Sequence, residues 1–97
     1  MISIRVKYKV KKDNLEEVKK AIEEFVTEVK SEPGVLSYNA FQEEDISFVH
    51  FITFKDDMAK KSHENSVHVR KFVDFLYPVC EEEPVFNNLN LVKSNKI

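Results

Sequence analysis

The chain has 97 residues, of which 42% are hydrophobic and 33% are charged, with a formal net charge of −2. This length predicts one domain, residues 1–97, and a domain so small buries only roughly 60–65% of the surface of its unfolded chain, so that a partner would stabilise it. The acidic balance gives no general attraction to nucleic acids or anionic membranes, and no segment approaches the ~18 apolar residues of a membrane span.

The first strand and the first helix are indicated by a change of period. Residues 2–10, ISIRVKYKV, alternate between apolar and polar side chains, which is typical of a strand with one buried face. In residues 13–32 apolar side chains recur every three or four positions, which predicts an amphipathic helix. Asp13 and Glu16 have the spacing of a capping box, and the Pro-Gly pair at 33–34 ends the helix.

Residues 35–41 and 46–54 predict two more strands, joined by an acidic turn and therefore paired as an antiparallel hairpin. Both faces of the second of these strands are apolar. One face carries Ile46, Phe48, His50, Ile52 and Phe54, and the other carries Val49 and Phe51. We therefore expect this strand to be covered on both sides.

The second helical region is predicted to have two pieces. Residues 55–65 start with helix-favouring aspartates and contain few apolar side chains, whereas the stretch up to Pro78 carries a buried stripe. Asn65 or Ser66 is the expected N-cap of the second piece. Residues 81–93 predict a last strand, and residues 94–97 a frayed tail.

The resulting order, β-α-β-β-α-β, predicts the fold class: an α+β, ferredoxin-like sandwich with one antiparallel sheet and helices on one of its faces. The other face would be apolar and bare in a monomer, and such a patch usually marks an interface. We therefore expect a homodimer in which the two sheets face each other as a dimeric α+β barrel. The single cysteine, Cys80, excludes an intrachain disulfide and fits the cytoplasm, and the alternating amino-terminal stretch is not typical of a signal peptide.

Two segments resemble the antibiotic biosynthesis monooxygenase (ABM) family. EPGVLSYNAF, residues 32–41, is similar to the family's turn into its second strand. FITFKDDMAKKSHENSVHVRKF, residues 51–72, resembles its strand-to-helix segment with an H-x-x-S-x-H motif. The matching positions, in order, are Phe54, Ala59, His63, Ser66, His68 and Phe72.

The resemblance implies a homodimer with a pocket between sheet and helices. It also implies oxidation of a small aromatic, phenol-like or quinol-like substrate by O2, without a metal or another cofactor. Haem degradation, known in another branch, is not expected, because that branch's tryptophan falls on His63 and its histidine on Val73, which cannot ligate iron. The chain also has no tryptophan, and Phe54 stands where many relatives carry one.

His63 is the first candidate for proton transfer, because the unperturbed pKa of histidine, about 6.5, lies close to working pH. His50, His68 and Tyr38 follow as candidates. The expected substrate pocket is apolar and is lined by Phe48, Ile52, Phe54, Phe72 and Leu76.

Each candidate also has a structural interpretation. On a continuous helix, His63 and His68 would point roughly 140° apart, so they would act together only if the joint between the helices bends them toward each other. His50 should be buried and needs a hydrogen-bond partner, either as a core or dimer-interface histidine or as a pocket base. Tyr38 either supplies a hydroxyl to the cavity or packs at its rim. The histidine and carboxylate spacings match no compact metal motif, so no metal site is expected.

Two other functions remain open. A non-catalytic ligand-binding or stress-response protein would have the same fold and pocket, because fold does not fix function. An RNA-recognition motif shares the element order, and FVHF at residues 48–51 echoes part of its stacking motif. That motif's glycine and basic residue are missing here, so we expect no nucleic-acid partner and no membrane partner.

Overall fold

The computed structural model describes residues 1–95. The strands are β1 (Ile2–Val10), β2 (Val35–Glu43), β3 (Ser47–Phe54) and β4 (Cys80–Leu89). The helices are α1 (Leu15–Val29), α2 (Asp57–Glu64) and α3 (Val67–Leu76), with 3-10 turns η1 (Lys12–Asn14) and η2 (Tyr77–Val79). None of the described helices is long and apolar enough to span a membrane.

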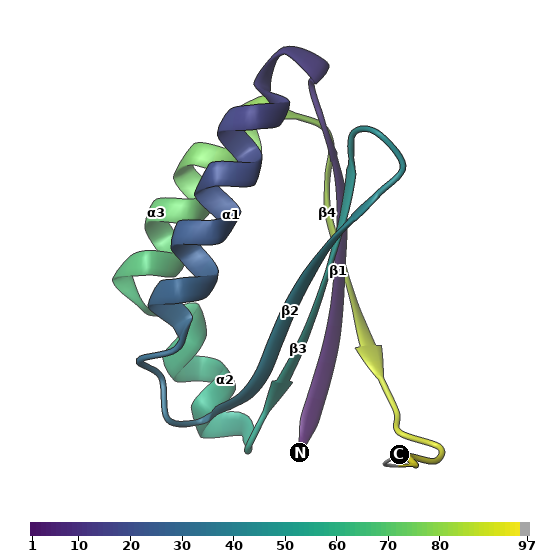
Figure 1. Cartoon of the computed structure of the whole chain (residues 1–97). Coiled ribbons are helices and arrows are strands. Elements are labelled where there is room, and N and C mark those ends of the chain that lie inside the picture. The colour runs from purple at the N-terminus through teal and green to yellow at the C-terminus, as the bar shows by residue number, and fades with distance from the viewer. Residues whose placement is uncertain (96–97) are drawn as a thin grey trace.

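The strands form one antiparallel sheet in the order β2-β3-β1-β4. All three α-helices lie on one face of this sheet, and the opposite face, here called the outer face, is uncovered (Figure 1). The predicted α+β, ferredoxin-like architecture is therefore confirmed. The hydrophobic core lies between the helices and the inner face of the sheet.

The start of α1 differs from the predicted capping box. Asp13 lies in η1 rather than at a helix cap, and the N-cap residue of α1, Asn14, makes no side-chain capping bond. The chain instead tightens into a 3-10 turn in which Asn14 N–H donates to the Lys11 carbonyl at 2.9 Å. Glu16 and Glu17 still lie in the first turn of α1, where they complement the helix dipole.

The joint between α2 and α3 is closed by one of the two predicted caps. Ser66 is the N-cap of α3, and its side chain accepts a hydrogen bond from Val69 N–H. The same hydroxyl donates to the carbonyl of His63 at 2.7 Å. Ser66 thus ties the end of α2 to the start of α3 and fixes the bend between them.

Gly34 allows the turn after α1 to lie directly against α2. A Cβ atom at this position would clash with the Cβ atom of Ala59. The backbone contact is reinforced by Lys55 N–H, which donates to the Gly34 carbonyl at 2.8 Å. This close approach brings the residues just before Gly34 beside α2.

The last strand is shorter than predicted. It begins at Cys80 and ends at Leu89, whereas the sequence pattern predicted residues 81–93. Leu89 pairs with Ser3, close to the amino-terminal end of β1, so that little of β1 remains to pair with the following residues. Positions 96–97 of the predicted tail lie outside the described residues.

Candidate functional site

A cavity of about 190 Å³ lies between the inner face of the sheet and the helices. Its wall is mostly apolar, with apolar side chains from β1, β3, β4, α1 and α3. The apolar lining is Ile4, Val6, Phe25, Ile52, Phe54, Val69, Phe72, Val73, Leu76, Pro84 and Phe86. Phe86 on β4 is 61% exposed and Glu64 at the end of α2 is also exposed, so the mouth of the cavity lies between β4 and the helices.

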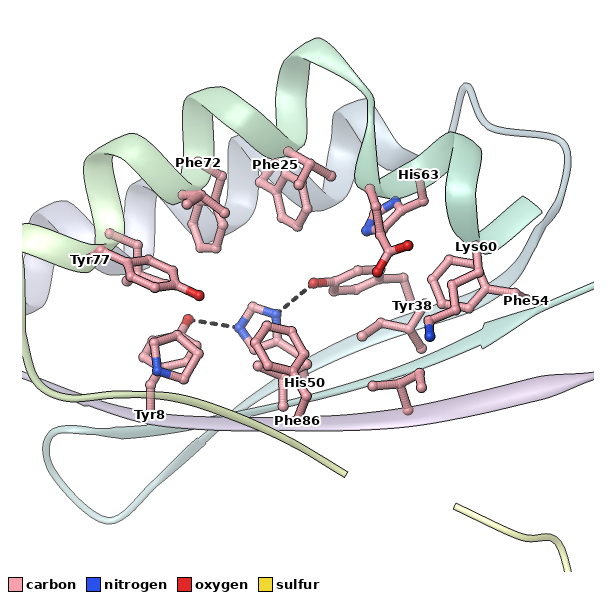
Figure 2. A pocket seen from close by; sticks show the side chains of 18 residues that line it. Tyr8, Phe25, Tyr38, His50, Phe54, Lys60, His63, Phe72, Tyr77 and Phe86 are labelled. Carbon is pink, nitrogen blue, oxygen red and sulfur yellow. Dashed lines mark hydrogen bonds between the residues drawn. The ribbon is translucent and has the colours of Figure 1, made fainter. Parts of the chain in front are cut away.

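Three polar side chains form a chain of hydrogen bonds on the floor of this cavity. His50 lies between two tyrosines: Tyr8 Oη is 2.7 Å from its Nε2, and Tyr38 Oη is 2.7 Å from its Nδ1 (Figure 2). The three residues come from β1, β3 and β2, whose register puts them on the inner face. We call this group the Tyr-His-Tyr chain.

Burial keeps all three members of the chain uncharged. Desolvation lowers the pKa of His50 to about 4. Desolvation also raises the pKa of Tyr8, helped by Tyr38 and Cys80, and that of Tyr38, helped by the charge of Glu32. A neutral imidazole has one N–H donor and one acceptor nitrogen. One tyrosine therefore donates to His50 while the other accepts from it and keeps its own O–H proton free for another group.

The depressed pKa of His50 predicts a stability that falls in acid. In the unfolded chain the imidazole takes up a proton near pH 6.5, whereas in the folded chain it stays neutral down to about pH 4. The unfolded state therefore binds more protons between these values, and stability falls as the pH is lowered through them. From pH 7 to pH 5 this one group should lower the free energy of unfolding by about 2 kcal/mol.

Urea denaturation at both pH values measures this loss, with His50→Gln as the matched variant. Glutamine can hydrogen-bond both tyrosines but does not titrate in this range. The variant should lose about 2 kcal/mol less than the natural chain over the same interval. An equal loss in both proteins would show that His50 is not the group responsible.

A second polar group lies beside the cavity. The carboxylate of Glu32, in the turn after α1, has its Oε2 2.8 Å from Nδ1 of His63 and 2.6 Å from Nε2 of His68. A carboxylate only accepts hydrogen bonds, so both imidazole nitrogens donate to it. The side chains of Glu32, His63 and His68 are only 14%, 10% and 15% exposed. We call these three residues the Glu-His-His cluster.

His63 connects the Glu-His-His cluster to the cavity, because its ring also lines the cavity wall. Its ring centroid lies 6.1 Å from that of Tyr38 and 5.3 Å from that of Phe54. Within residues 1–95 its second nitrogen, Nε2, has no hydrogen-bond partner, whereas both nitrogens of His50 are occupied. In Figure 2 His63 lies on the helix side of the cavity, across from the Tyr-His-Tyr chain.

A family model described as "Antibiotic biosynthesis monooxygenase" matches residues 1–74. The chain belongs to this family. The match covers most of the chain, including the two segments from which the resemblance was inferred, and it ends within α3. A search of the curated proteins found no significant match.

Solved structures agree with the fold of the ABM family. One described as an antibiotic biosynthesis monooxygenase superimposes with a TM-score of 0.89 at 19% identity, covering 96% of this chain and all of the other. Rv0793 from Mycobacterium tuberculosis gives 0.89 at 14% identity, covering 98% of both chains. A conserved protein from Methanosarcina mazei Go1 gives 0.82 at 24% identity, covering 92% of both chains.

Most of the pocket residues predicted for this ABM domain do line the cavity, namely Ile52, Phe54, Phe72 and Leu76. Phe48 does not. It is buried to one side, where its ring stacks on Tyr8 at a centroid distance of 5.7 Å. The cavity therefore ends before this position of β3.

The four predicted polar residues separate into the two groups. His50 and Tyr38 hydrogen-bond each other on the cavity floor, so the expectation that a buried His50 has a hydrogen-bond partner is confirmed. His63 lines the cavity as well. His68 does not line it but meets His63 at Glu32, with the two ring centroids 6.3 Å apart, because the joint at Ser66 bends the helices toward each other.

Two residues of these groups were not identified as functional from the sequence. Tyr8 was assigned only to the apolar face of the first strand, although its place opposite Phe48 in the register puts it next to His50. Glu32 was read only as part of a helix end. The sequence signal for the role of Glu32 was its position directly before Pro33 and Gly34, because Gly34 allows this turn to lie against α2.

Proposed function

We propose that this ABM protein is a monooxygenase that oxidises a small, phenol-like or quinol-like aromatic compound with O2 and without a resident cofactor. One observation carries the proposal: a mostly apolar cavity presents two separate proton-handling groups. These are the free Nε2 of His63 on one side and the hydroxyls of the Tyr-His-Tyr chain on the other.

The size of the cavity supports a substrate with one aromatic ring inside it. An apolar cavity of about 150 Å³ in another protein holds benzene, so about 190 Å³ accommodates a ring with small substituents. The rings of Phe25, Phe72 and Phe54 supply the apolar surface for it. A larger fused-ring compound would have to extend through the mouth past Phe86.

The polar groups support the proton-transfer step. His63 Nε2 accepts the proton of the substrate hydroxyl, while Glu32 holds the ring through Nδ1–H and stabilises the imidazolium that forms. The free O–H of the Tyr-His-Tyr chain then donates a hydrogen bond to the substrate oxyanion. Removing the proton makes the aromatic ring electron-rich enough to reduce O2.

The reaction needs no further reductant. The substrate anion transfers an electron to O2, and the two radicals combine at a ring carbon that carries hydrogen, which is opposite the oxygen in a phenol and next to it in a hydroquinone. Loss of the ring hydrogen and cleavage of the O–O bond leave one oxygen atom on that carbon as a carbonyl. The other oxygen atom departs as water, carrying the ring hydrogen and the proton returned by His63. Phenol and O2 thus give quinone and water.

We further propose that the protein acts as a cytoplasmic homodimer joined through the outer face of the sheet. Phe41 and Phe51 on β2 and β3 and Val85 and Leu89 on β4 are exposed there, as two apolar strips on either side of Arg5 and Lys7 of β1. An RNA-binding role finds little support in the placement of Phe48 on the inner face. Phe48, the first aromatic residue of the FVHF stretch, is buried against Tyr8 and cannot stack on a base.

Oxygen-electrode measurements with EDTA-treated protein and a panel of hydroquinones, substituted phenols and dihydroxyanthracenes test this function. We expect oxygen uptake with at least one single-ring compound, at a rate proportional to protein concentration. Compounds that bind without any oxygen uptake, detected by calorimetry, would instead support the non-catalytic ligand-binding protein.

A further inference from the structure

The Glu-His-His cluster joins three segments that are distant in sequence. Glu32 comes from the turn after α1, His63 from the last turn of α2 and His68 from the first turn of α3. Their three nearest ligand atoms, one carboxylate oxygen and two imidazole nitrogens, all lie within 4.8 Å of one another. The fold therefore holds these groups together before any ligand arrives.

The surroundings of the cluster leave its negative charge poorly balanced. Within residues 1–95, the carboxylate of Glu32 forms no ion pair with a lysine or arginine, and its hydrogen bonds go only to the two imidazoles. The ring of Phe25 lies 6.0 Å from that of His63 and 5.9 Å from that of His68, so water has limited access. A partly buried carboxylate in such a place is stabilised by a cation.

We propose that Glu32, His63 and His68 form a binding site for one divalent transition-metal ion of the Zn²⁺ type. Two imidazoles and one carboxylate are a donor set used for Zn²⁺, Co²⁺ and Fe²⁺, whereas Mg²⁺ and Ca²⁺ prefer oxygen ligands alone. The ion would take Nδ1 of His63, Nε2 of His68 and Oε2 of Glu32 and would complete its coordination with water.

The movement required is small. With metal–ligand distances of about 2.0–2.2 Å, the ligand atoms of a tetrahedral ion are about 3.3 Å apart. The present distances of 2.8 Å and 2.6 Å must therefore open by about 0.5–0.7 Å. The turn that carries Glu32 and the joint at Ser66 are short connections between elements, and side-chain rotation there provides this opening.

The site would also regulate the cavity, an inference that rests on the proposed function. At present Nδ1 of His63 carries the proton, so Nε2 is free to accept one from the substrate. A metal ion on Nδ1 leaves the imidazole proton on Nε2, which then becomes a donor. Metal binding would therefore switch off the base, and EDTA would restore it.

The test uses untagged, metal-free protein. One titration adds CoCl2 and follows the ligand-field absorption of the bound ion, and a second adds ZnCl2 and measures the heat of binding by calorimetry. We expect saturable binding of one ion per chain. Glu32→Gln and His68→Gln should each weaken it by at least about tenfold. Glu28→Gln, the same change at an exposed position one helical turn earlier, should bind as the natural chain does.

Absence of saturable binding in the natural chain, or equal affinity in Glu32→Gln and Glu28→Gln, would overturn the site. If Glu32→Gln lacks a cooperative thermal transition, His68→Gln decides in its place. Ion binding is measured without substrate, and oxygen uptake is measured in EDTA, so failure of the metal site and failure of the proposed function are distinguishable.

Discussion

His63→Asn should reduce oxygen uptake by about 10²–10⁴-fold, the range that a general base contributes. The asparagine amide nitrogen occupies nearly the place of Nδ1, so the variant keeps a donor for Glu32. What it removes is Nε2, the nitrogen that is free at the cavity wall. The expected loss therefore reports on proton transfer rather than on the packing of α2, and it is measured as kcat in the oxygen electrode.

Lys61→Gln is the matched control, because Lys61 lies in the same helix and does not line the cavity. It should keep oxygen uptake within about twofold, as expected for an exposed position away from the site. Thermal melts of both variants check that they are folded. Oxygen uptake in His63→Asn equal to that of the natural chain would show that another group takes the proton.

Phe51→Lys should convert the proposed dimer into single chains at micromolar concentration. Phe51 lies on the outer face of β3, 39% exposed, with its ring edge-on to Phe41 at a centroid distance of 6.0 Å. A lysine there would place a positive charge in the centre of the proposed interface. Its neighbour on β1 is Arg5, which is also positive, so β1 offers it no acidic partner. Burying such an unpaired charge weakens association by more than about 100-fold.

Analytical ultracentrifugation measures this change. The natural chain should sediment with about twice the mass of one 11.4 kDa chain, and Phe51→Lys with the mass of one. Val67→Lys is the control, since Val67 is an 84% exposed apolar residue on α3, away from the outer face. A natural chain that is monomeric at micromolar concentration would refute the dimer.

The fold could be predicted because its signals are local. Alternation assigned the strands, three- and four-residue spacing assigned the helices, and the joint at Ser66 was visible as a break in the apolar stripe. The errors lie at element ends. The structure has a 3-10 turn where a capping box was predicted at Asp13. It ends β4 earlier than predicted, because little of β1 remains to pair beyond Ser3.

The candidate site could be predicted only in part, because its contacts join distant segments. His50 and Tyr38 stood out on strands with apolar neighbours, and His63 stood out through the H-x-x-S-x-H motif that resembles the ABM family. Tyr8 and Glu32 did not, because a tyrosine on a strand and a glutamate before Pro-Gly are ordinary in sequence. Their roles arise from strand register and from the close approach of Gly34 to α2, neither of which has a local signature.

Mass spectrometry of the product formed under ¹⁸O2 tests the central claim most directly. With EDTA-treated protein and a single-ring phenol or hydroquinone that supports oxygen uptake, a monooxygenase should transfer one ¹⁸O atom to a ring carbon that carried hydrogen and release the other as water. The label should be present with the natural chain and be greatly reduced with His63→Asn. A product without ¹⁸O, or no turnover of any compound in the panel, would contradict the account.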